Sequence, residues 1–222
     1  MSLLVDRRAG VKCSIAAIVI CLAACGVPSE PDPEPLPSTR MPPVNPARID
    51  RVRGDLPDGY EVAGLAGGIA PAVSWGLGAE WTADPPQCGV LADPVTGDAR
   101  GWSASGAGGI VYAAVADGRS PDPALLSQCG RWTVSGGKTS GDVSLGAAPS
   151  IDGAQTVGMA TATTTVVEGG TETRSHADTA SAYLDGHVVF VTVVTDPGSP
   201  NPQLGQDFAA ELLVRTVSAL RG

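Results

Sequence analysis

Three consecutive runs rich in threonine and valine constrain the fold of this chain more than any other feature. They cover residues 156–168, 171–184 and 187–195. Gly169-Gly170 separates the first two runs and Asp185-Gly186 the last two, and both dipeptides favour two-residue hairpin turns because they accept positive φ. The pattern predicts an antiparallel meander. Because the last run is apolar on both faces, we expect it to form a central strand.

Shorter segments add strands and helices to this meander. The apolar run 109–116 predicts a buried strand, and residues 202–220 place apolar side chains at helical spacing behind the cap and first-turn pair Asn201-Pro202. Turn and propensity signals predict further short strands at 61–65, 131–135 and 142–145, and short helices at 47–53, 85–92 and 121–128. The glycine-rich stretch up to Trp81 is expected to be irregular.

The C-terminal helix needs an apolar surface to cover its stripe, and the meander offers one. The expected class is therefore α+β, an antiparallel sheet that contains the three-stranded meander and further strands. We expect the amphipathic C-terminal helix and the short helices to pack on one side of it.

Composition excludes several classes of protein. The chain has 222 residues and a net charge of −9, and it lacks the concentration of Lys and Arg that binding to a nucleic acid backbone requires. No apolar run reaches the roughly 20 residues that span a bilayer. A polypeptide of this composition is expected to form one globular domain with additional segments.

The first 24 residues have the organisation of a secretory signal peptide. Arg7, Arg8 and Lys12 precede an apolar stretch at 15–24, which is too short for a stable membrane span. The stretch ends in Leu-Ala-Ala before Cys25, and this ending resembles the lipobox of bacterial lipoproteins. That resemblance implies cleavage before Cys25, a diacylglyceryl group on its sulfur, and attachment to the membrane from the extracytoplasmic side. An ordinary signal peptide with an incidental cysteine is the alternative.

Residues 25–46 are expected to form a tether. Eight prolines lie between positions 27 and 46, and they favour an extended chain that reaches roughly 60 Å at ~3.1 Å per residue. Residues 47–222 then form a single extracytoplasmic domain. Cleavage would leave 11 basic and 22 acidic side chains, so the lipid rather than a polybasic patch would have to hold the protein at the membrane.

Of the five cysteines, Cys88 and Cys129 are the two that remain in the predicted domain. Two cysteines in an exported domain normally form a disulfide. A metal site is the competing interpretation, but no Cys-x-x-Cys spacing supports it. We expect no metal and no cofactor.

No catalytic motif in the sequence is complete. Ser103 lacks the closing glycine of a nucleophile elbow and is expected to lie in a turn. Ser135 begins a Ser-x-x-Lys match whose two glycines disfavour the helix that this motif opens. The Asp185-Gly186 turn separates His176 and His187 by roughly 26 Å, which prevents them from acting as a pair.

All four tryptophans, Trp75, Trp81, Trp102 and Trp132, lie in or beside glycine-rich segments. Either they supply core where aliphatic side chains are sparse, or they line a cleft for a lipid, glycan or peptide. The sequence leaves both interpretations open, with the core as the default.

Several short motifs carry a family resemblance: Pro-Pro-Gln-Cys at 85–88, Gly-Gly-Ile-Val-Tyr at 108–112 and Cys-Gly-Arg-Trp at 129–132. With the lipobox, the tether and the final helix, they resemble the small cell-envelope lipoproteins of mycobacteria and are similar to the extracellular sensor domain of the mycobacterial kinase PknH. The resemblance implies a sheet-and-helix domain with a ligand-binding cleft. This chain has one possible disulfide where that sensor domain has two.

The sequence thus favours a noncatalytic, membrane-anchored module that binds a ligand or a protein partner of the cell envelope. An envelope hydrolase with a serine nucleophile is the alternative.

Overall fold

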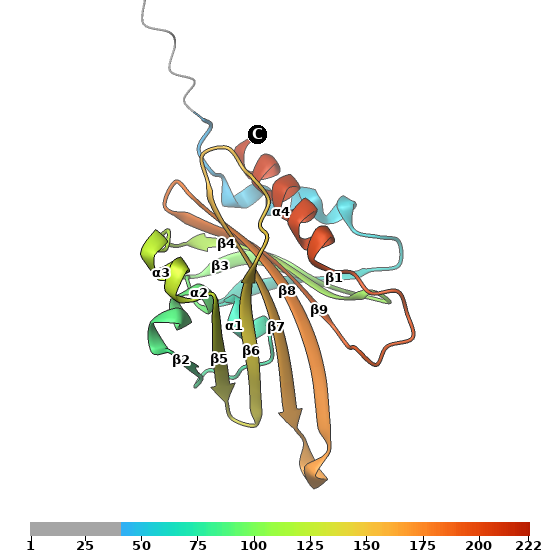
Figure 1. The fold of residues 1–222 in the computed structure, drawn as a ribbon. Coiled ribbons are helices and arrows are strands. Elements are labelled where there is room, and N and C mark those ends of the chain that lie inside the picture. Colours follow the sequence, from blue (N-terminus) through green and yellow to red (C-terminus); the bar gives the residue numbers. More distant parts are fainter. Residues whose placement is uncertain (1–40) are drawn as a thin grey trace, which may run out of the picture. The chain divides into compact units, whose positions relative to one another are not determined.

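The computed structural model describes residues 41–222, which form one antiparallel sheet of nine strands with helices on both of its faces (Figure 1). The α+β class is therefore confirmed. Across the sheet the strands follow in the order β1 (Glu61–Gly67), β3 (Ala99–Gly106), β4 (Gly109–Asp117), β9 (His187–Thr195), β8 (Glu172–Leu184), β7 (Gln155–Val166), β6 (Thr139–Gly146), β5 (Arg131–Gly136) and β2 (Thr82–Asp84). The predicted signal peptide, Cys25 and most of the predicted tether lie outside the described residues.

The helices are short except for the last one. They are η1 (Pro46–Asp55), α1 (Pro71–Ser74), η2 (Pro86–Cys88), α2 (Gly89–Ala92), α3 (Pro123–Gln128), η3 (Glu168–Gly170) and α4 (Gln206–Arg221). Within residues 41–222 no helix has the length and apolar character needed to cross a membrane.

The C-terminal meander is confirmed as strands β7, β8 and β9. The β8–β9 hairpin turns at Asp185-Gly186, where both residues adopt positive φ, +50° and +77°. The β7–β8 connection is longer than the expected two residues: the ladder ends at the pair Val166 and Glu172, and η3 occupies the turn between them. Strand β9 lies between β4 and β8 and is buried on both faces, as its apolar run predicts.

Two apolar clusters pack on opposite faces of the sheet, because neighbouring residues of a strand point to opposite sides. On β9, Val189, Val191 and Val193 join one cluster, whereas Val188 and Phe190 join the other. The first cluster lies under η1 and α4, which pack against each other, and the second includes residues of α1 and α2 (Figure 1). The expectation that the helices share one side of the sheet is therefore wrong.

Helix α4 begins later than predicted. Its N-cap is Gly205, and the residues before it form an extended connection in which Leu204 donates its backbone N–H to the Gly108 carbonyl at 3.0 Å. This anchoring to the β3–β4 hairpin prevents Asn201-Pro202 from opening the helix. The apolar stripe itself is as expected, with Leu212, Leu213 and other apolar side chains of the helix buried.

Strand β3 was not predicted. Ser103 lies inside it, opposite Tyr112 of β4, so the expectation of a turn serine is wrong. The segment consists largely of glycine, alanine and serine, whose intrinsic strand propensity is low. Pairing with β1 and β4 supplies the stabilisation that local propensity does not provide.

Cys88 and Cys129 form a disulfide whose Cα atoms lie 5.6 Å apart. Both residues are fully buried in the cluster opposite α4. The bridge fixes the end of η2 to the residue that follows α3.

Candidate functional site

Helix α4 covers only part of its face of the sheet. It packs on β8 and β9, and the same face of β7, β6, β5 and β2 continues beyond it (Figure 1). On β8 the residues Ala180 and Ala182 lie under the helix. Because every second residue of a strand points to the same face, His176 and Asp178 also lie on this face, closer to the N-terminal end of β8.

Two adjoining hollows occupy the uncovered area, with volumes of about 710 and 480 Å³. Thr133, Asp142, Ala162 and His176 line both, so the hollows form one depression, which we call the open trough. Cross-strand pairing explains why these four residues meet: Thr133 pairs with Asp142, Asp142 with Ala162, and Ala162 with His176. The trough also contains Asp84, Arg131, Ser135, Ser140, Ser144, Ala160, Thr164 and Arg174.

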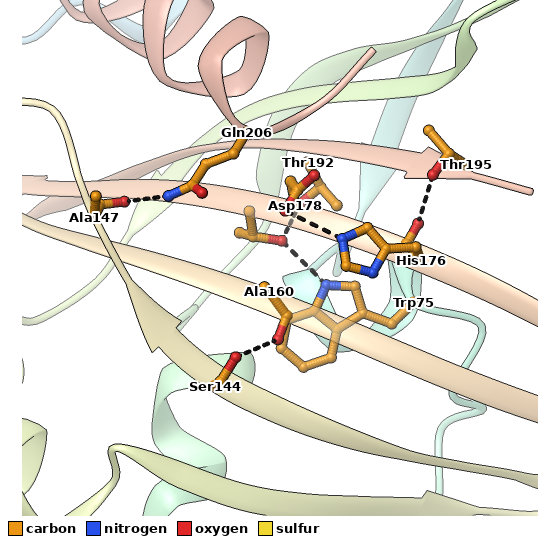
Figure 2. A network of polar contacts seen from close by, with 10 residues as sticks. Trp75, Ser144, Ala147, Ala160, His176, Asp178, Thr192, Thr195 and Gln206 are labelled. Atoms are coloured by element: carbon orange, nitrogen blue, oxygen red, sulfur yellow. Dashed lines mark hydrogen bonds and ion pairs between the residues drawn. The ribbon is translucent and has the colours of Figure 1, made fainter. Parts of the chain in front are cut away.

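His176 and Asp178 form the most enclosed polar pair beside the trough (Figure 2). The His176 Nε2 atom lies 3.4 Å from Asp178 Oδ1, and the two side chains are 41% and 12% exposed. Asp178 also lies close to Gly205, the N-cap of α4, where a Cβ atom would be 3.9 Å from Oδ2.

The other charged groups of the trough are free to meet a ligand. Arg131, Arg174, Asp84 and Asp142 are exposed, and none forms an ion pair within residues 41–222. Arginine can donate two parallel hydrogen bonds to a carboxylate or phosphate, and the hydroxyl groups between the charges can donate or accept. The surface is thus suited to a hydrophilic molecule.

Three of the four tryptophans are buried in the core. Trp75 and Trp132 pack together with ring centroids 6.3 Å apart in the cluster opposite α4, whereas Trp102 belongs to the cluster under α4. Trp75 donates its indole N–H to the Thr179 hydroxyl at 3.1 Å, and this hydroxyl shares a hydrogen bond with the Thr192 hydroxyl (Figure 2). Trp102 donates its indole N–H to the Ile49 carbonyl at 3.2 Å. The four tryptophans therefore do not surround one cleft.

Trp81 is half-buried and lines a separate hollow of about 620 Å³ with Pro86, Gly89 and Val90. A Cβ atom at Gly89 would contact the indole ring of Trp81 at 3.4 Å. The hollow contains one charged residue, Asp93, and offers fewer polar groups than the open trough.

The serines singled out from the sequence are not arranged as nucleophiles. Ser135 Oγ shares a hydrogen bond with Thr82 Oγ1 at 3.1 Å, and in the described part of the chain no serine or threonine hydroxyl is bonded to a histidine ring. His187 lies in the β8–β9 turn region, opposite Leu184, far along the strands from His176. Among residues 41–222 no group of three or more His, Cys, Asp or Glu side chains could hold a metal ion.

Sequence reasoning missed the open trough. Its residues come from five strands and occupy alternate positions, so that no local motif marks them. The alternation of exposed and buried residues in β5, with Arg131, Thr133 and Ser135 exposed between buried neighbours, was the one available signal.

Residues 45–221 match the family described as Domain of unknown function (DUF5642). The chain belongs to this family. A search of the curated proteins finds no match.

Two solved structures from mycobacteria are similar to this DUF5642 chain, which confirms the mycobacterial resemblance expected from the sequence. One is an uncharacterised protein of Mycobacterium smegmatis, the Rv0999 ortholog, with 21% identity and a TM-score of 0.59 over 82% of this chain and 99% of the other. The second is the extracellular domain of PknH from Mycobacterium tuberculosis, with 14% identity and a TM-score of 0.41 over 79% and 92%. The first shows that the fold is shared, and the second is too distant to carry an argument.

Proposed function

We propose that this DUF5642 protein is a noncatalytic, extracytoplasmic binding module, and that the open trough binds its ligand. The observation that carries the proposal is a large exposed depression whose arginines and aspartates have no ion-pair partners within residues 41–222. Charged side chains on a rigid sheet remain available to a ligand when the protein itself does not pair them.

The chemistry of the trough selects the class of ligand. Its floor contains the small side chains of Ala160 and Ala162, and guanidinium, carboxylate and hydroxyl groups surround them. A hydrophilic molecule with several hydrogen-bonding groups, such as a glycan or a peptide, would satisfy these side chains. An acyl chain would leave them without partners, at a cost of about 1 to 3 kcal/mol for each polar group that becomes buried.

Noncatalytic binding is supported by the geometry around His176. The imidazole lies beside Asp178, but within residues 41–222 no hydroxyl or thiol is bonded to its ring, so the nucleophile of a hydrolytic triad is missing from this pair. A hydrolase of this type would require a hydroxyl or thiol group bonded to the histidine ring.

The proposal is tested by a paired screen of the purified protein. Thermal unfolding is measured with panels of glycans, peptides and lipids, and hydrolysis of ester, peptide and glycosidic substrates is measured in parallel. A ligand that binds only the folded state raises the melting temperature by linkage, and we expect such a rise with a hydrophilic compound and without turnover. Turnover that is lost in the Ser135→Ala or Ser103→Ala variant would instead establish the hydrolase.

Membrane attachment is the second part of the proposal. The Leu-Ala-Ala-Cys sequence that ends at Cys25 supports lipidation. We expect Cys25→Ala to move the protein from the detergent phase to the aqueous phase in a phase-partitioning experiment, or to leave the signal peptide uncleaved. A Cys21→Ala variant is the matched control, because that cysteine lies within the predicted signal peptide. Partitioning and processing that are unchanged in Cys25→Ala would contradict the anchor.

A further inference from the structure

The sheet is open, so it has two edge strands, β1 and β2. The outer edge of a strand presents unpaired backbone N–H and C=O groups that can pair with another chain, unless the strand is short or protected by proline or charge. Strand β2 is protected in both ways: it has three residues, and Pro85 and Pro86 follow it directly.

Apart from the charge of Glu61 at its first position, strand β1 has no such protection. It has seven residues, of sequence Glu-Val-Ala-Gly-Leu-Ala-Gly, without proline, lysine or arginine. It pairs with β3, and residues 61–67 form no other backbone hydrogen bond with the rest of the described chain. Val62 is 40% exposed, and a Cβ atom added at Gly64 would meet no atom within 4 Å. The edge is therefore open to the approach of another strand.

The sequence indicates which chain can occupy this edge. The proline-rich residues 27–46 are unsuited to it, because their eight prolines lack the N–H groups that a ladder requires. A second copy of β1 supplies those groups over its whole length. We propose that β1 pairs antiparallel with β1 of a second copy, with the twofold axis at Gly64.

This register satisfies the charges and the faces of both strands. Gly64 lies opposite Gly64 of the second copy, Ala63 opposite Leu65, and Glu61 opposite Gly67. The two Glu61 carboxylates are then six positions apart along the strands, roughly 20 Å, so that they do not repel each other. Each residue lies opposite one whose number differs from its own by an even amount, such as 63 opposite 65. Residues that differ in this way share a face of the strand, so each face of one sheet continues into the same face of the other.

The pairing joins two nine-stranded sheets into one sheet through a single pair of strands. An interface of this kind is small, and interfaces below the standard size are weak and reversible. We expect a dissociation constant on the order of micromolar, which the high local concentration of a membrane-attached protein would favour.

Crosslinking of single-cysteine additions in the full chain tests the pairing. Gly64→Cys places two thiols opposite each other at the twofold axis, and the open space around Gly64 accommodates the new side chain. With a short thiol-specific bis-maleimide, this variant should give a crosslinked dimer on a denaturing gel, with a yield that falls on dilution. The same treatment of the unchanged chain measures any contribution of the native cysteines.

Two variants provide matched controls. Glu61→Cys lies on the same strand but far from its own copy in this register, and Thr82→Cys is exposed on the protected edge strand β2. Both should crosslink no more than the unchanged chain. The absence of a Gly64→Cys dimer, or equal yields from Gly64→Cys and Glu61→Cys, would overturn the proposal. Neither result would bear on ligand binding in the open trough, which is measured separately.

Discussion

Tyr183 has a hydroxyl group that the fold buries without a hydrogen-bond partner in the described part of the chain. Burial raises the pKa of this phenol above its ordinary value of 10.0, because the ionised form would lose its hydration. Above pH 10 the unfolded chain therefore releases this proton while the folded chain keeps it. The folded state then binds more protons, and the free energy of unfolding falls as the pH rises.

We expect Tyr183→Phe to weaken this alkaline loss of stability. At neutral pH the variant should be as stable as the parent or more stable by about 1 kcal/mol, since it removes an unpaired buried polar group. Urea unfolding between neutral pH and about pH 11 measures both effects. Tyr112→Phe is the control, because Tyr112 is only half-buried and burial raises its pKa by less than it raises the pKa of Tyr183. Equal pH slopes for Tyr183→Phe and the parent would contradict this account.

At the scale of elements, α4 holds η1 and the sheet together. Leu213 is completely buried in the cluster between α4 and the sheet, whereas its neighbour Val214 is 41% exposed to solvent. Leu213→Ala should lower the free energy of unfolding by about 2 to 5 kcal/mol through lost burial and the cavity that remains. Val214→Ala, the matched control, should change it by less than about 0.5 kcal/mol. Chemical denaturation compares the two, and similar losses would show that α4 does not pack as described.

How far an element could be predicted depended on where its stabilisation arises. The meander β7–β8–β9 was predictable because Thr- and Val-rich runs and Asp185-Gly186 carry strand and turn signals in the local sequence. Strand β3 was not, because its glycines and small side chains become a strand only through pairing with β1 and β4. The start of α4 was misplaced for a similar reason: the contact between Leu204 and Gly108 joins segments that are distant in the sequence.

The candidate site depended still more on long-range contacts. His176 and Ser135 were visible as residues, but the trough that contains both arises from the pairing of β5, β6, β7 and β8. That α4 leaves these strands uncovered follows from the size of the sheet, which no local pattern reveals. The tryptophans were the more conspicuous candidates in the sequence, and three of them fill the core instead.

In the molecule as a whole, one face of the sheet is divided between helix α4 and an exposed polar surface. The helix and the core stabilise the sheet, and Asp84, Arg131, Asp142 and Arg174 of the trough form no ion pair within residues 41–222. The proposed ligand binding, the proposed membrane attachment and the proposed pairing through β1 involve three different parts of the chain. Variants of Ala162, Cys25 and Gly64 therefore test the three proposals separately.

Filling the open trough with a large side chain tests whether the trough is the binding site. Ala162 is exposed at its centre and lines both hollows, so Ala162→Trp would occupy the space of a ligand without disturbing the core. Ala124→Trp, at an exposed position on α3, adds the same side chain elsewhere. The ligand is the hydrophilic compound that most raises the melting temperature of the parent. We predict that titration calorimetry shows similar affinities for the parent and Ala124→Trp. The affinity of Ala162→Trp should be at least tenfold weaker. Undiminished affinity in a folded Ala162→Trp protein would contradict the assignment of the trough as the binding site.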